Sequence, residues 1–234
     1  MILGRFKHPP SAAFDEINAA VEALTLRTVC FNAHEYPHSI PDGAVVFNLE
    51  NPAQVCEAAR REWEGHELWD FSERNAAELG AKHVPVGYHP SMERFRRRPS
   101  DQRDIDVVFT GCMNERRAKV LDELRMRGLH VVHVPSGSLY GFARDAILAR
   151  AKLALNMLFY EDGTFPALRV AHLVANRIPV LSETCPEEWN FVPTVAYEDL
   201  VDAAEGFIKG GGPFYSLAED AFAQFKVRPL VLPS

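Results

Sequence analysis

Residues 106–117 read DVVFTGCMNERR, an apolar run followed by a glycine turn and then by a polar stretch that can begin a helix. Valine and phenylalanine favour an extended strand, and Gly111 permits a tight turn after it. Asn114 is a residue type that caps helices, so a helix is expected from there to Arg127, with Gly128 just past its end. A strand that leads through a turn into a helix is the opening half of a βαβ unit.

The same alternation of short apolar runs and helix-type segments extends along the whole chain. It predicts an α/β protein with parallel sheets flanked by helices, because parallel strands need a crossover that is usually helical. A similar number of strands in each half predicts two similar α/β domains in tandem. The expected strands are 1–6, 26–32, 44–49, 67–71, 82–87, 105–110, 130–134, 153–158, 178–182 and 194–197.

A polar stretch at 93–104, broken by Pro99 and without an apolar period, marks the expected domain boundary. It gives an N-terminal domain of residues 1–98 and a C-terminal domain of residues 99–234. The same stretch would act as the hinge if the domains close on a ligand. Residues 214–225 carry apolar side chains at helical spacing, and such a C-terminal helix can cross back and pack on the first domain.

The composition is that of an ordinary globular protein, with 47% hydrophobic and 24% charged residues and a formal net charge of −7. No apolar run approaches the roughly 20 residues of a membrane-spanning helix, so no membrane span is expected. The negative charge gives no general attraction for a nucleic-acid backbone. The four cysteines lack metal or redox spacing, and the first residues lack the features of a secretory signal. A reducing, cytoplasmic location is therefore expected.

Polar groups follow three strands of the second half, at the edge where parallel sheets bind ligands. Arginine side chains and the N–H groups of a helix start can together bind a diphosphate. An equally weighted alternative is that the glycine only makes a tight turn and the arginines are solvated. The residues concerned are Gly111, Asn114, Arg116, Thr164 as the expected cap of a helix, Arg169 and Glu183.

Motifs at 106–117, 140–145, 151–156 and 169–183 follow one another in the second half, and others at 47–52, 68–75 and 84–88 occupy the first. In order and spacing they resemble the GT-B fold glycosyltransferases of the CgeB-like group, a glycosyltransferase family 1-type group. The likeness covers most of residues 44–200.

The resemblance implies two Rossmann-like domains, with a nucleotide-sugar donor held mainly by the C-terminal domain and an acceptor mainly by the N-terminal one. It implies no metal ion and no cofactor besides the donor substrate, since arginine and a helix N-terminus neutralise the leaving diphosphate. Many retaining members carry two glutamates eight positions apart, whereas here Arg169 follows Glu161. The ribose contact and the stereochemistry therefore stay open. The implied donor-site residues are Gly111, Asn114, Arg116, Arg144, Asn156, Glu161, Thr164, Phe165, Arg169 and Glu183.

Two residues of the first half are candidates for the general base. Glu50 lies at the end of the expected strand 44–49, and His34 follows the expected strand 26–32. Glu50 could equally cap the helix that follows it. His34 and His38 are better explained as ordinary loop histidines than as metal ligands, because a proline between them argues against a helix. Arg144 could instead form an ion pair with its neighbour Asp145.

The leading hypothesis is a metal-independent glycosyltransferase that moves a sugar from a nucleotide diphosphate donor to an acceptor hydroxyl. The alternatives are a non-catalytic sugar-nucleotide binding module and a sugar-nucleotide epimerase or hydrolase on the same fold. A polysaccharide or a small metabolite is favoured as acceptor over a modified nucleic acid. The sequence leaves open the donor, the acceptor and whether the chain forms a homo-oligomer.

Overall fold

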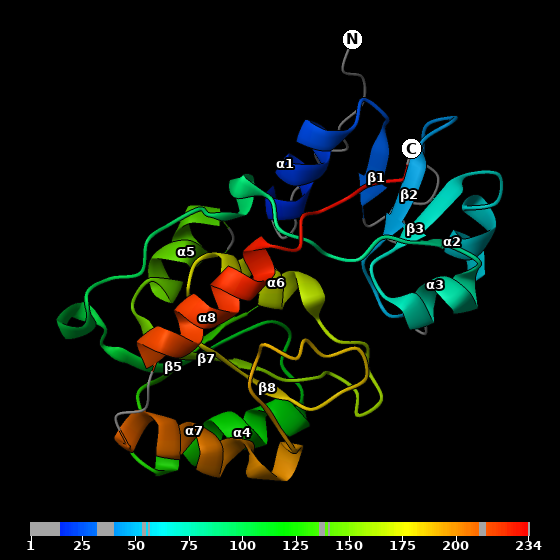
Figure 1. Cartoon of the computed structure of the whole chain (residues 1–234). Coiled ribbons are helices and arrows are strands. Elements are labelled where there is room, and N and C mark those ends of the chain that lie inside the picture. Colours follow the sequence, from blue (N-terminus) through cyan, green and yellow to red (C-terminus); the bar gives the residue numbers. More distant parts are fainter. Residues whose placement is uncertain are drawn as a thin grey trace. The chain divides into compact units, whose positions relative to one another are not determined.

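A computed structural model describes residues 15–31, 40–52, 55, 57–135, 139, 141–210 and 214–233. The chain divides into two compact units, Met1–Gly87 with Leu230–Ser234 and Tyr88–Pro229, and each is described here by itself. Both units consist of a parallel β-sheet flanked by helices (Figure 1). The predicted α/β class with parallel sheets is confirmed.

The first unit contains the parallel sheet β1 (Val29–Phe31), β2 (Val45–Asn48), β3 (Glu67–Asp70) and β4 (Lys82–His83), which pair in this order. All four residues of β2 are buried, as expected for an inner strand of a parallel sheet. The helices described in this unit are α1 (Asp15–Leu24), α2 (Glu57–Glu62) and α3 (Glu73–Leu79). The predicted strand at 1–6 lies outside the described residues.

The second unit contains five parallel strands in the order β6-β5-β7-β8-β9. They are β5 (Ile105–Thr110), β6 (Val131–Val134), β7 (Ala151–Asn156), β8 (Val180–Glu183) and β9 (Thr194–Val195). Its helices are α4 (Glu115–Met126), α5 (Gly141–Leu148), α6 (Ala167–Ala175), α7 (Leu200–Lys209) and α8 (Phe214–Lys226). Figure 1 shows α4 and α7 together on one face of the sheet, and α5, α6 and α8 on the other.

One hydrophobic core of the second unit lies between the sheet and the α4–α7 layer. Apolar side chains alternate into it from the strands, and α4 adds residues at helical spacing. Its members include Val107, Phe109, Val120, Leu121, Leu124, Leu153, Leu155, Leu200 and Ala204. This core fixes the ends of β5 and β7 relative to the start of α4.

Residues 88–104 belong to the second unit, so the structure divides the chain earlier than the predicted boundary after residue 98. Asn176, at the end of α6, holds this segment through its buried amide. Its Oδ1 accepts hydrogen bonds from the backbone N–H groups of Arg94 (2.7 Å) and Phe95 (3.0 Å), and its Nδ2 donates to Met92 O (2.9 Å). The segment expected to be a hinge is thus fastened to one unit.

Helix α8 also belongs to the second unit, where it packs on α6. Phe225 stacks on Trp189 with ring centroids 5.2 Å apart and meets Tyr88 edge-on at 5.9 Å. The structure groups this helix with the second unit, and its crossing back to pack on the first domain stays a prediction. Only Leu230–Ser234 is grouped with the first unit.

A buried ionic cluster surrounds Asp145, which is 4% exposed. Its carboxylate lies 3.0 Å from Nε2 of His172 and 3.3 Å from Nε of Arg94, and it pairs with Arg144 at 3.2 Å. Burial raises the pKa of Asp145, but the hydrogen bond from His172 and the nearby charges outweigh it and hold the pKa below its usual value. Arg144 is thus part of an ion pair, as the alternative interpretation of the sequence has it.

This cluster predicts a loss of stability in acid. Because the folded pKa of Asp145 lies below the unfolded one, the unfolded state binds more protons between the two values, and stability rises with pH there. The contribution is complete above the usual aspartate pKa of about 4 and is lost as the pH falls through the folded value. Urea unfolding at a series of pH values should show this decline, and Asp145→Asn should flatten it. An unchanged pH dependence in that variant would contradict the assignment.

Candidate functional site

The strand order of the second sheet creates a topological switch point at its carboxyl edge. The chain passes from β5 to β6 on one side and places β7 on the other side of β5. Ligands of open parallel sheets bind at such a switch point, where the connecting loops diverge. Two helices that follow these strands, α4 after β5 and α6 after β7, begin at this edge.

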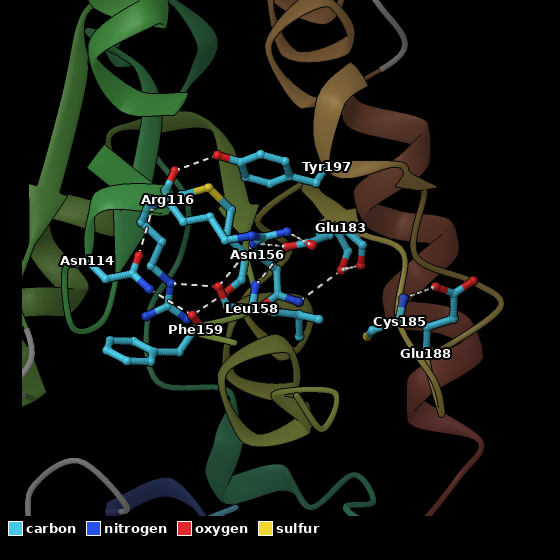
Figure 2. Close-up of polar contacts among 12 residues, drawn as sticks. Asn114, Arg116, Asn156, Leu158, Phe159, Glu183, Cys185, Glu188 and Tyr197 are labelled. Atoms are coloured by element: carbon cyan, nitrogen blue, oxygen red, sulfur yellow. Dashed lines mark hydrogen bonds and ion pairs between the residues drawn. The ribbon is translucent and has the colours of Figure 1, made fainter. Parts of the chain in front are cut away.

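The β5–α4 loop lies at this carboxyl edge of the sheet. Gly111 has a φ of +140°, a conformation that other residues rarely adopt. Asn114 caps α4 by accepting a hydrogen bond from the N–H of Arg117 (3.0 Å), and its Nδ2 donates to Phe159 O (2.7 Å). Figure 2 shows this amide reaching across to the loop after β7. The cap therefore also joins the two loops.

Arg117 lies at the centre of the site and is only 3% exposed. Its guanidinium donates to Cys112 O (2.7 Å), Met157 O (2.6 Å) and Leu158 O (3.1 Å). It also lies against the rings of Phe109 and Phe159, at 5.0 and 5.1 Å. Burial, with the positive charge of Arg169 nearby, lowers the pKa of Arg117 to about 9. At that pKa the side chain still carries its charge near neutral pH.

The predicted donor site includes Arg116 and leaves out its neighbour Arg117, the second arginine of the same helix start. The available signal is the helical period, since Arg117 shares a face with Val120, Leu121 and Leu124, all of them buried. An arginine on the apolar face of a helix is buried only if its donors find partners, and here three backbone carbonyls provide them.

Arg116 forms a two-pronged ion pair with Glu183 at the end of β8. Its Nη1 lies 2.7 Å from Oε2 of the carboxylate, and its Nη2 contacts Oε1. The guanidinium also stacks on the Tyr197 ring at 3.7 Å, and the tyrosine hydroxyl donates to Arg116 O (2.8 Å) (Figure 2). Burial lowers the pKa of Arg116, but the hydrogen bonds and charge of Glu183 outweigh it, so the pKa is raised. A phosphate would have to compete with this carboxylate.

Arg169 reaches from the first turn of α6 back to the end of β5. Its Nη1 donates to Oδ1 of Asn156 (3.1 Å) and to Met157 O at 3.4 Å. The guanidinium lies 5.5 Å from the Phe109 ring. Asn156 in turn donates to Ser182 Oγ (2.9 Å). The structure therefore gathers Gly111, Asn114, Arg116, Asn156, Arg169 and Glu183, all predicted donor-site residues, around the same edge.

The other predicted donor-site residues are placed differently. Thr164 does not cap α6, because the helix begins at Ala167 with Pro166 at the N-cap position and no side-chain cap bond. Phe165 is buried and packs on Trp189 at 5.5 Å. Glu161 is exposed in the β7–α6 loop, and Arg144 belongs to the Asp145 cluster.

The charges of the site do not balance. Arg116, Arg117 and Arg169 lie together with the carboxylate of Glu183, and the charge of Glu161 also acts on Arg116. Three guanidinium groups and two carboxylates leave a surplus of positive charge among these five side chains. Charge repulsion between Arg117 and Arg169 is relieved when an anion approaches both. The arrangement is suited to a phosphate or carboxylate ligand.

Gly111 is predicted to tolerate no side chain. A Cβ there would lie 2.8 Å from Nη2 of Arg169, and the φ of +140° would be strained. We expect Gly111→Ala to lower the free energy of unfolding by about 1–3 kcal/mol. The matched control is Gly206→Ala, since that glycine lies inside α7 with nothing within 4 Å of the added Cβ. Chemical denaturation of both variants tests the prediction, and equal stabilities would contradict it.

The first unit has its own polar cluster where β2 and β3 end. Asn48 donates to Asp70 (2.6 Å) and to Glu50 O (2.8 Å), and Asp70 accepts from the N–H of Ser72 (2.8 Å). Glu50 therefore lies at a carboxyl strand end, as predicted, with its backbone held by this cluster. His34 lies outside the described residues.

Over the described ranges, no three or more His, Cys, Asp or Glu side chains are grouped to hold a metal ion. Over those same ranges, every helix is too short or too polar to cross a membrane.

Comparison with known proteins finds distant relatives, and no protein-family model matches the chain. Three uncharacterized proteins of Acanthamoeba polyphaga mimivirus are similar to parts of it. They are 26% identical over 116 residues, 26% over 104 residues and 22% over 152 residues, covering 46%, 43% and 59% of this chain. These stretches make up 13%, 14% and 50% of the relatives, so the chain spans half of their length or less. Among solved structures, an alpha1,3-fucosyltransferase matches with a TM-score of 0.41 and 10% identity, over 85% of this chain and 71% of that one.

Proposed function

We propose that this chain binds a nucleotide diphosphate sugar at the carboxyl edge of its second sheet and transfers the sugar to an acceptor hydroxyl. The observation that carries the proposal is the surplus of arginine charge at the β5–β7 switch point, between the starts of α4 and α6. A diphosphate suits this place because it presents two charged groups to guanidinium donors and helix N-termini at once. Three of the sequence motifs that resemble GT-B glycosyltransferases, at 106–117, 151–156 and 169–183, contribute residues to this edge.

The same charges would act during the reaction. When the bond from the anomeric carbon to the diphosphate breaks, negative charge builds on the leaving oxygen. Arg169 is the nearest guanidinium to Gly111, and Arg117 adds a fixed positive charge beneath it. Donors that are already in place stabilise this charge without reorganisation. Glu50 and His34 remain the proposed candidates for removing the acceptor proton.

The proposal is tested by measuring ligand-induced changes in melting temperature with nucleoside diphosphates and their sugar conjugates, each with and without Mg²⁺. A ligand that binds only the folded state raises this temperature. We expect a shift with one class of nucleotide sugar that does not depend on Mg²⁺. If no nucleotide or nucleotide sugar shifts the melting temperature, the proposal is wrong.

Product analysis with a radiolabelled donor then separates the alternatives. Label appearing in an acceptor supports transfer, whereas free labelled sugar or an isomerised donor would indicate a hydrolase or an epimerase. Binding without any turnover across an acceptor panel would indicate a non-catalytic module, for which the fold is equally suited.

A further inference from the structure

Tyr160 presents an exposed aromatic ring directly beside the arginine cluster. It follows β7 in the loop that leads to α6, and 47% of its surface is exposed. Its ring meets that of Phe159 edge-on, with centroids 4.8 Å apart and planes at 74°. Phe159 in turn lies against the Arg117 guanidinium at 5.1 Å. Arg117, Phe159 and Tyr160 thus form a row of contacts from a buried guanidinium to an exposed ring.

The backbone under this ring is fixed on both sides. Asn114 donates to Phe159 O at 2.7 Å, and Arg117 holds the two preceding carbonyls. On the far side, the N–H of Gly163 donates to Tyr160 O at 3.1 Å and closes a turn. An aromatic ring on a rigid backbone loses little entropy when a flat ligand stacks on it.

Tyr160 is an uncharged ring beside a group of arginines. Arg117 lies against Phe159, its neighbour in the chain, and the charge of Glu161, the next residue, acts on Arg116. A diphosphate is attracted to the arginines. The uncharged aromatic end of the same ligand is then left to contact the exposed ring of Tyr160.

We propose that Tyr160 is the stacking surface for the base of a nucleoside diphosphate whose phosphates lie at the arginine cluster. This inference rests on the proposed function and deepens it by separating the base contact from the phosphate contact. Stacking is tolerant of base identity because every base has a π-face. Tyr160 therefore contributes affinity for nucleosides in general, and its hydroxyl is dispensable.

The test compares binding of UDP, GDP and ADP with binding of inorganic pyrophosphate by titration calorimetry. The variants are Tyr160→Ala, Tyr160→Phe and the control Phe142→Ala. Phe142 is a matched control because it is 86% exposed and lies in the first turn of α5, after the neighbouring strand β6. Loss of one base-stacking contact weakens nucleotide binding by about tenfold or more.

We expect Tyr160→Ala to weaken the preferred nucleoside diphosphate about tenfold while leaving pyrophosphate within about twofold. Tyr160→Phe and Phe142→Ala should both bind like the unmodified protein. The inference is overturned if nucleotide affinity is unchanged in Tyr160→Ala, or if Phe142→Ala alone weakens it; nucleotide binding, and with it the proposed function, would still stand. Failure of every nucleotide to bind the unmodified protein would overturn both proposals. Equal losses for nucleotide and pyrophosphate would also overturn the inference, because they would show a structural role.

Discussion

Replacing Arg117 by alanine is expected to lower the free energy of unfolding by about 3–5 kcal/mol, the range for breaking a buried polar network. The guanidinium is the partner of three backbone carbonyls, two of which belong to the fully buried residues Met157 and Leu158. An acceptor left buried without a donor costs about 1–3 kcal/mol. The contacts of the side chain with the rings of Phe109 and Phe159 would be lost as well.

Urea unfolding followed by tryptophan fluorescence measures this effect. Arg125→Ala is the matched control, because that arginine lies on the same helix, is half-exposed and pairs with Asp122 three residues away. Its removal should change stability by no more than about 0.5 kcal/mol. Arg117→Met, which refills the space without restoring the donors, should fall between the two. A stable Arg117→Ala protein would contradict the role assigned to this side chain.

Replacing Arg169 by glutamine is expected to weaken nucleoside diphosphate binding about 50-fold. Hydrogen bonds to charged groups contribute about 1.5–3 kcal/mol, and a guanidinium can make two of them to one phosphate. Arg169 is chosen because its Nη2 lies beside Gly111 in the β5–α4 loop, where the phosphates are proposed to bind. Glutamine keeps a polar group near Asn156, so the fold should survive.

Titration calorimetry with the nucleotide identified in the ligand panel measures the change. Arg144→Gln is the informative control, since the sequence motifs imply a donor contact for it, whereas the structure places it against Asp145. Its affinity should stay within about twofold of the unmodified protein. Comparable losses in the two variants would show that the arginine cluster is not the phosphate site.

Much of the fold could be predicted from local pattern. The strand at 105–110 has the predicted bounds, because its apolar run is continuous and ends at a glycine. The strand expected at 153–158 is observed as Ala151–Asn156, since pairing with β5 begins at Ala151. The order of the strands in the sheet could not be predicted from the sequence, because the side of β5 on which each crossover returns depends on packing between distant elements.

The site was predictable in its location and less so in its roles. Parallel strands end at one edge, so polar groups after three strands had to converge. Which arginine faces a ligand depends on partners far away in the chain, such as Glu183 for Arg116. The helix start at Thr164 was wrong because Pro166 shifts the first helical turn to Ala167. The polar stretch at 93–104 resembled a linker because its partner, Asn176, lies far along the sequence.

That last contact determines how the second unit could be produced alone. A gene fragment that starts at residue 99 would remove Met92, Arg94 and Phe95, the backbone partners of the Asn176 amide. The amide of Asn176, a residue that is 1% exposed, would lose both of its donors and the acceptor Met92 O, and would keep only the hydrogen bond to His172 O (2.8 Å). A fragment spanning 88–229 retains the segment and α8. Residues 88–98 thus cover part of α6. An expressed fragment that omits them as a linker would expose that part of the helix that carries Arg169.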